Sequence, residues 1–550
     1  MPNKNKDITY GNAFFEDQAL IAQYDTRYNK LQSMRVNYDP IYQELAVLCD
    51  PKNAYFTVKR APGDVSQLVA KTDDTAQTYL PIHAAVMNSL LTPAAYLWHR
   101  MEFNNYETQE KYGQQLGVQN DFLYKKRYCS ASNFICAVNT LYINNAVYGW
   151  YVLEMTKDEA HKQVCYRALP ITEFMIDQNE RGFVDTFYRK VDMTYRRLRE
   201  MFPKYVPRCA KDASPDNPMA WLDRTVTLMH VVEPSTTEPR KFDSVYIDMN
   251  ERVIIEKTVE KHSKYIAGRA ATFSNTNDPY GFSPIMSVFP SVKNLNAVSF
   301  DMIKATHHAS RFDLVTGDDI VNPKNYPDVT SIINGGFDAD GNMQVGVLAQ
   351  RDMPTLDYMV NGWRQRIKDV LFVEMFSILQ DTQSRSATDA MLKANERANI
   401  IAPMGDRFSR ELLLPMIELE LQYYAEMHEL PDFPDGAQGA TFDIILDNPM
   451  LRGQRLDSAN AIINMGASLA QIGQLDTEFN IDRTKSYLAQ AYNVPMSVFN
   501  TPKEKESVVE AKQQEAQMQM LMENANKLGS GIKDLAEAGA AGQGTQTPAQ

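Results

Sequence analysis

The sequence predicts an α+β protein that is mainly helical. Apolar residues recur at helical spacing through the first 150 residues and again after residue 290. Between residues 150 and 260 the chain instead has short β-branched and aromatic runs separated by turn residues, which is typical of strands. At 550 residues and 44% hydrophobic composition, the chain is long and apolar enough to bury a large core.

The N-terminal part of the chain predicts three helices, at 25–50, 73–97 and 115–148. The first ends at Asp50, because the residue before a proline disfavours helical backbone angles. The third ends at Gly149, since glycine is favoured just past the C-terminus of a helix.

Strand character begins at residue 150. It is interrupted by one short helix at 193–203, which Pro203 stops. Strands are then expected at 225–232, 243–249 and 252–257. The interval 207–220 is rich in Pro, Asp and Asn and is expected to be a loop.

The middle of the chain has a helix–insertion–helix order. Residues 291–310 and 356–380 each carry an apolar stripe at helical spacing. The interval 311–353 alternates turn signals with short apolar runs and predicts a small α/β insertion containing a hairpin. Two helices that flank a compact insertion place it at one end of a rod, and rods packed around an axis form a tube.

Loop and helix then alternate toward the C-terminus. Residues 380–384 contain no apolar side chain and are expected to form a loop. The capping-box pattern at 386–389 opens a helix that runs to about His428, with kinks expected at Pro403 and Pro415. Further helices are expected at 453–473, 482–492 and 503–527. The Gly-, Ala- and Gln-rich end, residues 528–550, is expected to be disordered.

Charge and composition restrict the class of partner. The formal net charge is -13 and the isoelectric point is about 5.3. A protein that grips DNA usually has a basic surface, so either DNA is not a partner or DNA passes without being held. No apolar run reaches the roughly 18 residues that span a bilayer, so no membrane partner is expected. None of the five cysteines forms a C-x-x-C pair, which favours an intracellular, reducing assembly site.

The sequence contains no familiar catalytic motif, neither a P-loop nor H-E-x-x-H nor G-x-S-x-G. We therefore expect no enzyme activity and no cofactor. The segment 338–342 resembles a calcium loop, but its glycine falls at the fourth position instead of the sixth, which favours a hairpin turn. His307 and His308 point about 100° apart on a helix and do not converge on one ion, so no metal site is predicted.

Several short motifs occur in a fixed order between residues 30 and 430. They are Leu90-Leu91-Thr92-Pro93 before Trp98-His99-Arg100-Met101, Ser132-Asn133-Phe134 before Tyr148-Gly149, Gly182-Phe183-Val184-Asp185 before Arg189, Tyr280-Gly281-Phe282-Ser283-Pro284 before Lys293-Asn294-Leu295-Asn296, and Ala387-Thr388-Asp389 before Glu396-Arg397. In this order they resemble the portal, or head-to-tail connector, family of short-tailed, T7-like bacteriophages (podoviruses). Asp389 departs from the family pattern, which has a glutamate there.

The resemblance implies a portal fold with wing, stem, clip and crown, assembled as a ring around a central channel. Carried onto this chain, the parts are a wing at 1–290, stem helices at 291–310 and 354–380, a clip at 311–353, a channel loop at 381–388, a long kinked helix and wing return at 389–449, a crown at 450–527 and a disordered tail at 528–550.

The resemblance also implies a function. It is that of a viral portal protein, a dodecameric ring at one capsid vertex through which double-stranded DNA is packaged and ejected. The implied partners are further copies of the chain, the major capsid protein, tail adaptor proteins and the terminase packaging motor. The implied location is the virion, after assembly in the host cytoplasm.

Basic side chains of the two rod helices and polar side chains of the following loop are the candidate DNA-channel contacts. They are Lys304, Arg311, Arg364, Arg366, Lys368, Gln383, Ser384 and Arg385. For the helix residues, a solvated basic face or salt bridges to a neighbouring subunit is the alternative. For the loop, the alternative is a plain connection between two helices.

Two other functions stay open on the sequence alone. One is a different virion structural component, such as a minor capsid or tail adaptor protein, although the order of rod and insertion argues against it. The other is an enzyme, such as a nuclease with a dispersed carboxylate site, which metal-dependent DNA cleavage by the purified chain would reveal.

Overall fold

The computed structural model describes residues 8–60, 63–65, 71–95, 97–211, 219–273, 278–310, 314–315, 340, 346–347, 354–374, 405–431, 441–446, 458–468 and, after these, 484, 487–488, 508, 514 and 517–520. Expectations for Arg311, Pro403, the loop 381–388 and the tail 528–550 lie outside the described residues.

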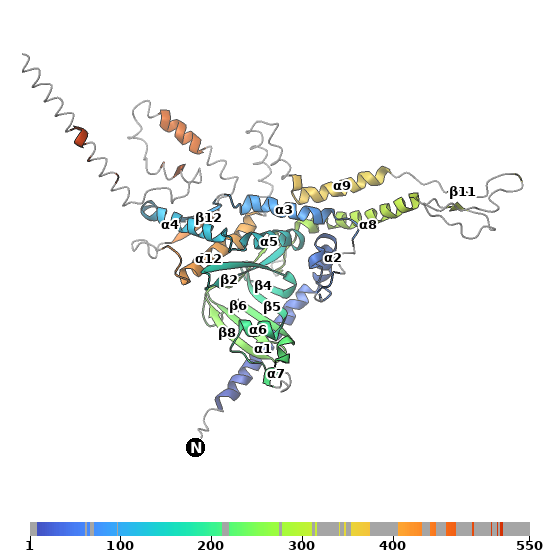
Figure 1. Cartoon of the computed structure of the whole chain (residues 1–550), viewed down its shortest axis with the longest axis horizontal. Coiled ribbons are helices and arrows are strands. Elements are labelled where there is room, and N and C mark those ends of the chain that lie inside the picture. The colour runs from blue at the N-terminus through green and yellow to red at the C-terminus, as the bar shows by residue number, and fades with distance from the viewer. Residues whose placement is uncertain are drawn as a thin grey trace, which may run out of the picture.

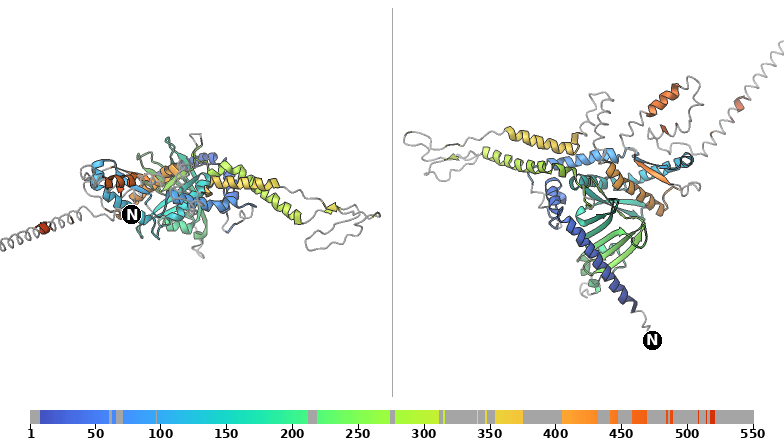
Figure 2. Two further views of the ribbon diagram at one scale, coloured as in Figure 1. Left: turned by 90° about the horizontal axis from the view of Figure 1, so that it is seen from above. Right: turned by 180° about the vertical axis from the view of Figure 1, so that it is seen from behind.

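The described chain forms a body of antiparallel sheets and packed helices, from which a two-helix rod projects to one side (Figure 1). Views from above and from behind show the same rod, with the N-terminal helix running along the body in a different direction (Figure 2). The mixture of helix and sheet agrees with the predicted α+β class.

The helices of the described residues have the following bounds. They are α1 (Ile8–Arg35), α2 (Asp39–Cys49), α3 (Thr75–Leu91), α4 (Tyr106–Arg127), α5 (Phe134–Tyr148), α6 (Tyr195–Met201), α7 (Arg208–Lys211), α8 (Pro284–Ser310), α9 (Pro354–Val370), the π-helical turn η5 (Ser409–Leu413) and α12 (Leu414–Glu426), with short 3-10 turns η1 (Pro51–Asn53), η3 (Ile171–Glu173) and η4 (Ala220–Asp223). Residues 458–468 are also helical, within the helix expected at 453–473.

The strands of the described residues form four antiparallel sheets. Their bounds are β1 (His99–Phe103), β2 (Trp150–Asp158), β3 (Gln163–Leu169), β4 (Phe174–Gln178), β5 (Val184–Thr194), β6 (Thr225–Pro234), β7 (Phe242–Asp248), β8 (Val253–Glu260), β9 (Tyr265–Arg269), β10 (Leu314–Val315), β11 (Gly346–Val347) and β12 (Phe442–Leu446). The larger two have the strand orders β3-β2-β9 and β4-β5-β6-β7-β8, and the pairs are β1-β12 and β10-β11.

The strands predicted between residues 150 and 257, and the short helix among them, are confirmed. Three further strands, β1, β9 and β12, were not predicted. In β1 and β12, His99 pairs with Leu446 and Phe103 with Phe442, across more than 300 residues of sequence. A five-residue strand whose partner lies so far away has no local signal that distinguishes it from a loop.

The single helix predicted at 25–50 is wrong, because α1 ends at Arg35 and α2 begins at Asp39. Pro40 lies in the first turn of α2, where its missing N–H costs nothing, whereas inside a continuous helix it would clash with the carbonyl of Val36. Arg35 stabilises the break between α1 and α2, because its guanidinium is buried and donates to the carbonyl of Ile171 at 2.7 Å.

The helix predicted at 115–148 is two helices, α4 and α5, separated by residues 128–133. Polar side chains in this break bond to backbone groups instead of supporting a helix. Asn133 accepts a hydrogen bond from the N–H of Tyr166 at 2.9 Å, and Ser132 accepts one from Phe134 at 3.2 Å. The predicted end at Gly149 is confirmed, with φ of 79°.

Apolar side chains from both sheets and their covering helices form the core. One side of the five-stranded sheet is covered by α1, through buried Ile21, Tyr24, Tyr28 and Leu31. The three-stranded sheet packs against α5 and α12. A separate cluster joins α2, α3 and β2 to the first half of α8 and to α9, so the base of the rod shares the core of the body.

The chain that returns from the rod packs back into the body through η5 and α12. The π-helical turn lies directly before Pro415, where the kink was predicted: the N–H of Leu414 bonds to the carbonyl of Ser409, one residue further back than in an α-helix. Glu411 in this turn accepts from the buried guanidinium of Arg269 at 3.1 Å, which ties η5 to β9.

Candidate DNA-channel surface

The rod consists of α8 and α9, packed side by side (Figures 1 and 2). Leu295 of α8 and Val360 and Ile367 of α9 are buried between the helices and the body. The first helix begins at Pro284, seven residues before the predicted start, because Ser283 caps it by accepting from the N–H of Met286 at 2.9 Å.

Polar contacts fix the base of the rod to the body. The amide oxygen of Asn296 accepts from the N–H of Thr72 at 2.9 Å. Arg364 of α9 forms an ion pair with Asp73 at 3.2 Å. Burial alone would raise the pKa of the Asp73 carboxyl, but hydrogen bonds from Thr75 and Arg364 outweigh burial and hold that pKa below its ordinary value.

The second rod helix ends at Val370, so the prediction of one unbroken helix from 354 to 380 is wrong, and residues 375–380 lie outside the described residues. Phe372 has φ of +55°, a backbone conformation that cannot continue a right-handed helix. His83 of α3 is buried beside this end, with its ring stacked on Phe372 and its Nδ1 3.0 Å from the carbonyl of Leu371. Burial lowers the pKa of His83 to about 4, so the ring is neutral near pH 7.

Two short strands near the two ends of the insertion form an antiparallel pair. Leu314 of β10 lies opposite Val347 of β11, and Val315 lies opposite Gly346. This pairing brings residues 314–315 and 346–347 of the insertion together. The rest of the predicted α/β insertion lies outside the described residues, apart from the turn at Asp340.

Four of the predicted DNA-contact residues are described, and they fall into two groups. Arg364 is bound to Asp73, and the ammonium of Lys368 lies 5.6 Å from the ring centre of Tyr79, so both face α3 or the residues just before it. Lys304 and Arg366 are exposed and form no ion pair with any described residue. Gln383, Ser384 and Arg385 lie outside the described residues, as does Arg311.

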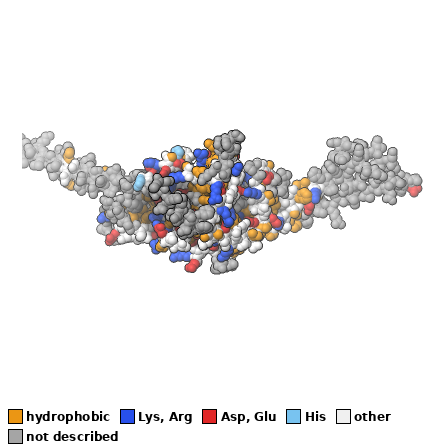
Figure 3. Space-filling view, turned by 90° about the horizontal axis from the view of Figure 1, so that it is seen from below, with side chains coloured by type: hydrophobic (Ala, Val, Ile, Leu, Met, Phe, Trp, Pro, Cys, Tyr) orange, Lys and Arg blue, Asp and Glu red, His pale blue; other side chains and the backbone are white. Residues whose placement is uncertain are grey.

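Apolar side chains are also exposed on the outer half of the rod. Tyr358 of α9 is 83% exposed, and its neighbour Met359 is 47% exposed. Phe300 and Ile303 of α8 are similarly exposed, off the buried stripe. Figure 3 shows hydrophobic side chains, in orange, on the surface of the part that projects from the body. These exposed residues were not predicted from the sequence. Phe300 and Ile303 are three residues apart and lie off the apolar stripe of α8, which is the signal that could have identified them.

Two kinds of site are absent from the part of the chain that the structure describes. No cluster of three or more His, Cys, Asp or Glu side chains there is arranged to hold a metal ion. Among the described helices, none combines the length and apolar character that crossing a membrane requires.

The body and its projecting helix pair define the class: an α+β protein with a helical hairpin that carries an insertion. The chain belongs to the family of bacteriophage head to tail connecting proteins, whose profile matches residues 22–499. This confirms the family resemblance found in the sequence.

Curated relatives match over nearly the whole chain. A probable portal protein of Bordetella phage BPP-1 is 22% identical over 533 residues, which cover 92% of this chain and 94% of that protein. A portal protein of Salmonella phage epsilon15 is 20% identical over 540 residues, with the same coverage of both chains. Among solved structures, a chain from the neck of an empty GTA particle covers 76% of this chain and 90% of its own length, at 12% identity and a TM-score of 0.33.

Proposed function

We propose that this chain is a portal subunit, twelve copies of which close into a ring around a channel for double-stranded DNA. The observation that carries the proposal is the α8–α9 rod, which is anchored to the body at one end and carries the insertion at the other. Family membership and two full-length relatives named as portal proteins support it.

The parts of the chain take the following roles in this proposal. The body up to residue 283 and the returning α12 are the wing, α8 and α9 are the stem, and 311–353 is the clip that docks tail adaptor proteins. Residues 381–388 form a channel loop and 450–527 a crown. The packaging motor and the major capsid protein contact the same ring at one vertex of the virion, assembled in the host cytoplasm, and the chain itself performs no catalytic step.

Neighbouring rods cover the exposed apolar side chains of the stem. Tyr358 and Met359 of one copy lie against the outer face of α8 in the next, where Phe300 and Ile303 are exposed. Such a heterologous contact, repeated by rotation, closes into a ring. In this proposal Lys304 and Arg366 are the charged positions that face the channel, because neither forms an ion pair with a described residue.

Negative-stain images of the purified full-length chain test the proposal. We expect closed rings with a central opening and about twelve repeats. Single subunits, or an open lattice without rings, would contradict the portal proposal and favour another virion component. Cleavage of DNA that requires added magnesium or manganese and co-purifies with the chain would instead favour an enzyme.

A further inference from the structure

A cavity of about 760 Å³ lies where β2, β8 and α12 meet. One wall is formed by residues 155–159, at the end of β2. The other wall is formed by residues 259–262 and by Lys264, where β8 ends and the chain turns into β9. From α12, Tyr423 and Glu426 also line it. We refer to this space as the β2–β8 slot.

The strand along the first wall has a free edge. β2 pairs with β3 from Val152 to Asp158 but with β9 only from Trp150 to Glu154. Past Glu154, the N–H of Met155 still bonds to the carbonyl of Lys264 at 2.9 Å. Backbone groups alternate in direction along a strand, so the N–H and carbonyl of Lys157 face the same side as the Met155 N–H. Within the described chain the Lys157 N–H has no hydrogen-bond partner.

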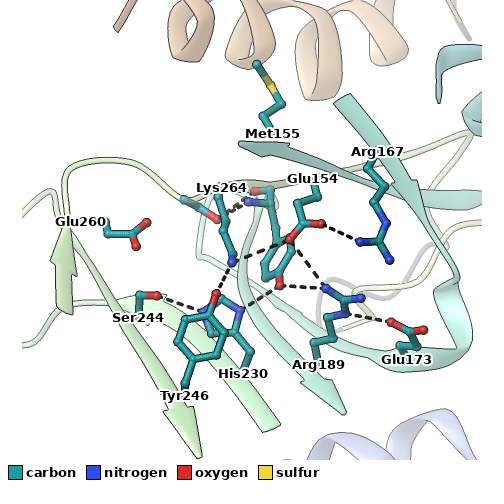
Figure 4. A network of polar contacts seen from close by, with 12 residues as sticks. Glu154, Met155, Arg167, Glu173, Arg189, His230, Ser244, Tyr246, Glu260 and Lys264 are labelled. Carbon is teal, nitrogen blue, oxygen red and sulfur yellow. Dashed lines mark hydrogen bonds and ion pairs between the residues drawn. The ribbon is translucent and has the colours of Figure 1, made fainter. Parts of the chain in front are cut away.

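Side-chain contacts hold both walls in place. Lys157 forms an ion pair with Glu426 at 2.7 Å, and its ammonium lies 5.4 Å from the ring centre of Tyr423. On the other wall, Lys264 donates to the hydroxyl of Tyr246 and lies 3.7 Å from Glu154 (Figure 4). The slot is therefore preformed, which lowers the entropic cost of binding.

The charges that remain unpaired in the slot are mainly negative. Glu159 on one wall and Glu260 on the other form no ion pair with any described residue. Lys261 is the unpaired cation of the lining, and it is exposed. Burial, helped by the Lys261 charge, lowers the pKa of His262, so this histidine adds no positive charge at pH 7.

We propose that the β2–β8 slot binds an extended peptide segment of another protein, which pairs with the free edge of β2 and carries a basic side chain. The peptide accepts a hydrogen bond from the Lys157 N–H and donates one to the Lys157 carbonyl, as in strand addition to a sheet edge. Its lysine or arginine lies between Glu159 and Glu260. The short edge makes this a weak contact, with a dissociation constant on the order of 100 µM.

A labelled probe peptide tests the proposal with the full-length chain. The probe has eight residues that alternate valine with lysine or threonine, and a matched probe has glutamate in place of lysine. Fluorescence anisotropy should show saturable binding of the basic probe and at least tenfold weaker binding of the acidic one. Absence of binding by the basic probe, or equal binding of both, would overturn the proposal.

Two variants at one position separate the backbone contact from the side chain. Lys157→Ala removes the ammonium but keeps the N–H, whereas Lys157→Pro removes both. The N–H of Lys157 is not part of the ladder with β3, so proline is tolerated at this edge position. The proline variant should bind about fivefold more weakly than the alanine variant, as expected for one lost hydrogen bond. Equal binding of the two variants would refute the strand-addition geometry.

A third variant leaves the backbone intact. Glu260→Gln should reduce the preference for the basic probe over the acidic one by several-fold, and an unchanged preference would contradict the charge assignment. Binding is measured on both isolated subunits and rings. We expect equal binding to both, whereas loss of binding on ring formation would mean that a second copy of this chain fills the slot.

Discussion

Arg127 of α4 and Glu420 of α12 form an ion pair inside the core, with side chains that are 0% and 1% exposed. The Arg127 Nε donates to Glu420 at 3.0 Å, and the Tyr166 hydroxyl donates to the same carboxylate at 2.6 Å. Burial would lower the pKa of Arg127, but the Glu420 charge outweighs it and holds that pKa above its ordinary value. This pair joins the N-terminal helices to the segment that follows the rod.

Removing one partner of this pair should strongly destabilise the body. Glu420→Ala leaves the Arg127 charge buried without compensation, so the free energy of unfolding should fall by about 3–5 kcal/mol in urea titrations. The matched control is Glu238→Ala, which breaks the exposed pair with Lys241 and should cost about 0–1 kcal/mol. Similar small losses in both variants would show that the buried pair contributes little.

Gly149→Ala should destabilise the chain because a side chain does not fit there. A Cβ atom on Gly149 would lie 2.7 Å from the carbonyl oxygen of Gly281, and the residue also has positive φ. Gly182→Ala is the control, since Gly182 has φ of +80° but open space around it and should cost only about 1–2 kcal/mol. A larger loss of thermal stability for Gly149→Ala than for Gly182→Ala is expected, and the reverse order would contradict the close backbone approach.

His83 should make stability fall in acid. Its pKa of about 4 in the folded chain lies below the ordinary value of 6.5, so between these values the unfolded chain binds a proton that the folded chain does not. Stability is therefore lost as pH falls through this window, by about 2 kcal/mol from pH 7 to pH 5 for this residue. His83→Gln should lose correspondingly less between these two pH values. The same loss in variant and wild type would contradict the assignment.

Charge reversal on the stem should impair DNA passage without preventing assembly. Under the proposed function, Lys304→Glu combined with Arg366→Glu removes the two exposed cations of the described rod that form no ion pair with a described residue. Rings should still form in electron micrographs, but particles should contain less packaged DNA. Arg197→Glu reverses an exposed charge on α6, away from the rod, and should leave packaging unchanged. Normal packaging in the stem variant would argue against these residues as channel contacts.

Deletion of 311–353 should leave ring formation intact and prevent tail attachment. The two rod helices pack through their own apolar stripes, so their packing does not need the deleted segment, which includes the β10–β11 pair. Size-exclusion chromatography and electron microscopy of virions measure the two outcomes. Tailed particles that carry the deletion would refute the assignment of this segment as the clip.

The sequence predicted most of the described elements, because helical and strand periodicities are local properties. It failed where a distant part of the chain decides the local structure. The break at 36–38 is stabilised by Arg35 contacting Ile171, and β1 exists only because β12 pairs with it. The helix α9 ends at Val370 because Leu371 and Phe372 pack against His83. This contact between distant residues leaves no local pattern in the sequence.

The candidate site was predicted less completely than the fold. Sequence alone placed the basic residues on the rod. In the structure, Arg364 and Lys368, four residues apart, lie on the same side of α9. The sequence did not show that this side faces Asp73 and Tyr79 of the body, since that depends on how the rod is docked. The buried ion pair of Arg127 and Glu420 was missed for the same reason: its members are 293 residues apart.

The pairing of β1 with β12 has a consequence for synthesis of the protein. A ribosome that has completed β1 must translate more than 300 further residues before the partner strand exists. Because synthesis proceeds at about 5–20 residues per second, this takes tens of seconds. During that time part of the core of the unfinished domain is exposed to solvent. Chaperones that shield nascent chains are therefore needed most during this interval, and a premature stop codon anywhere before residue 442 leaves a product that cannot finish folding.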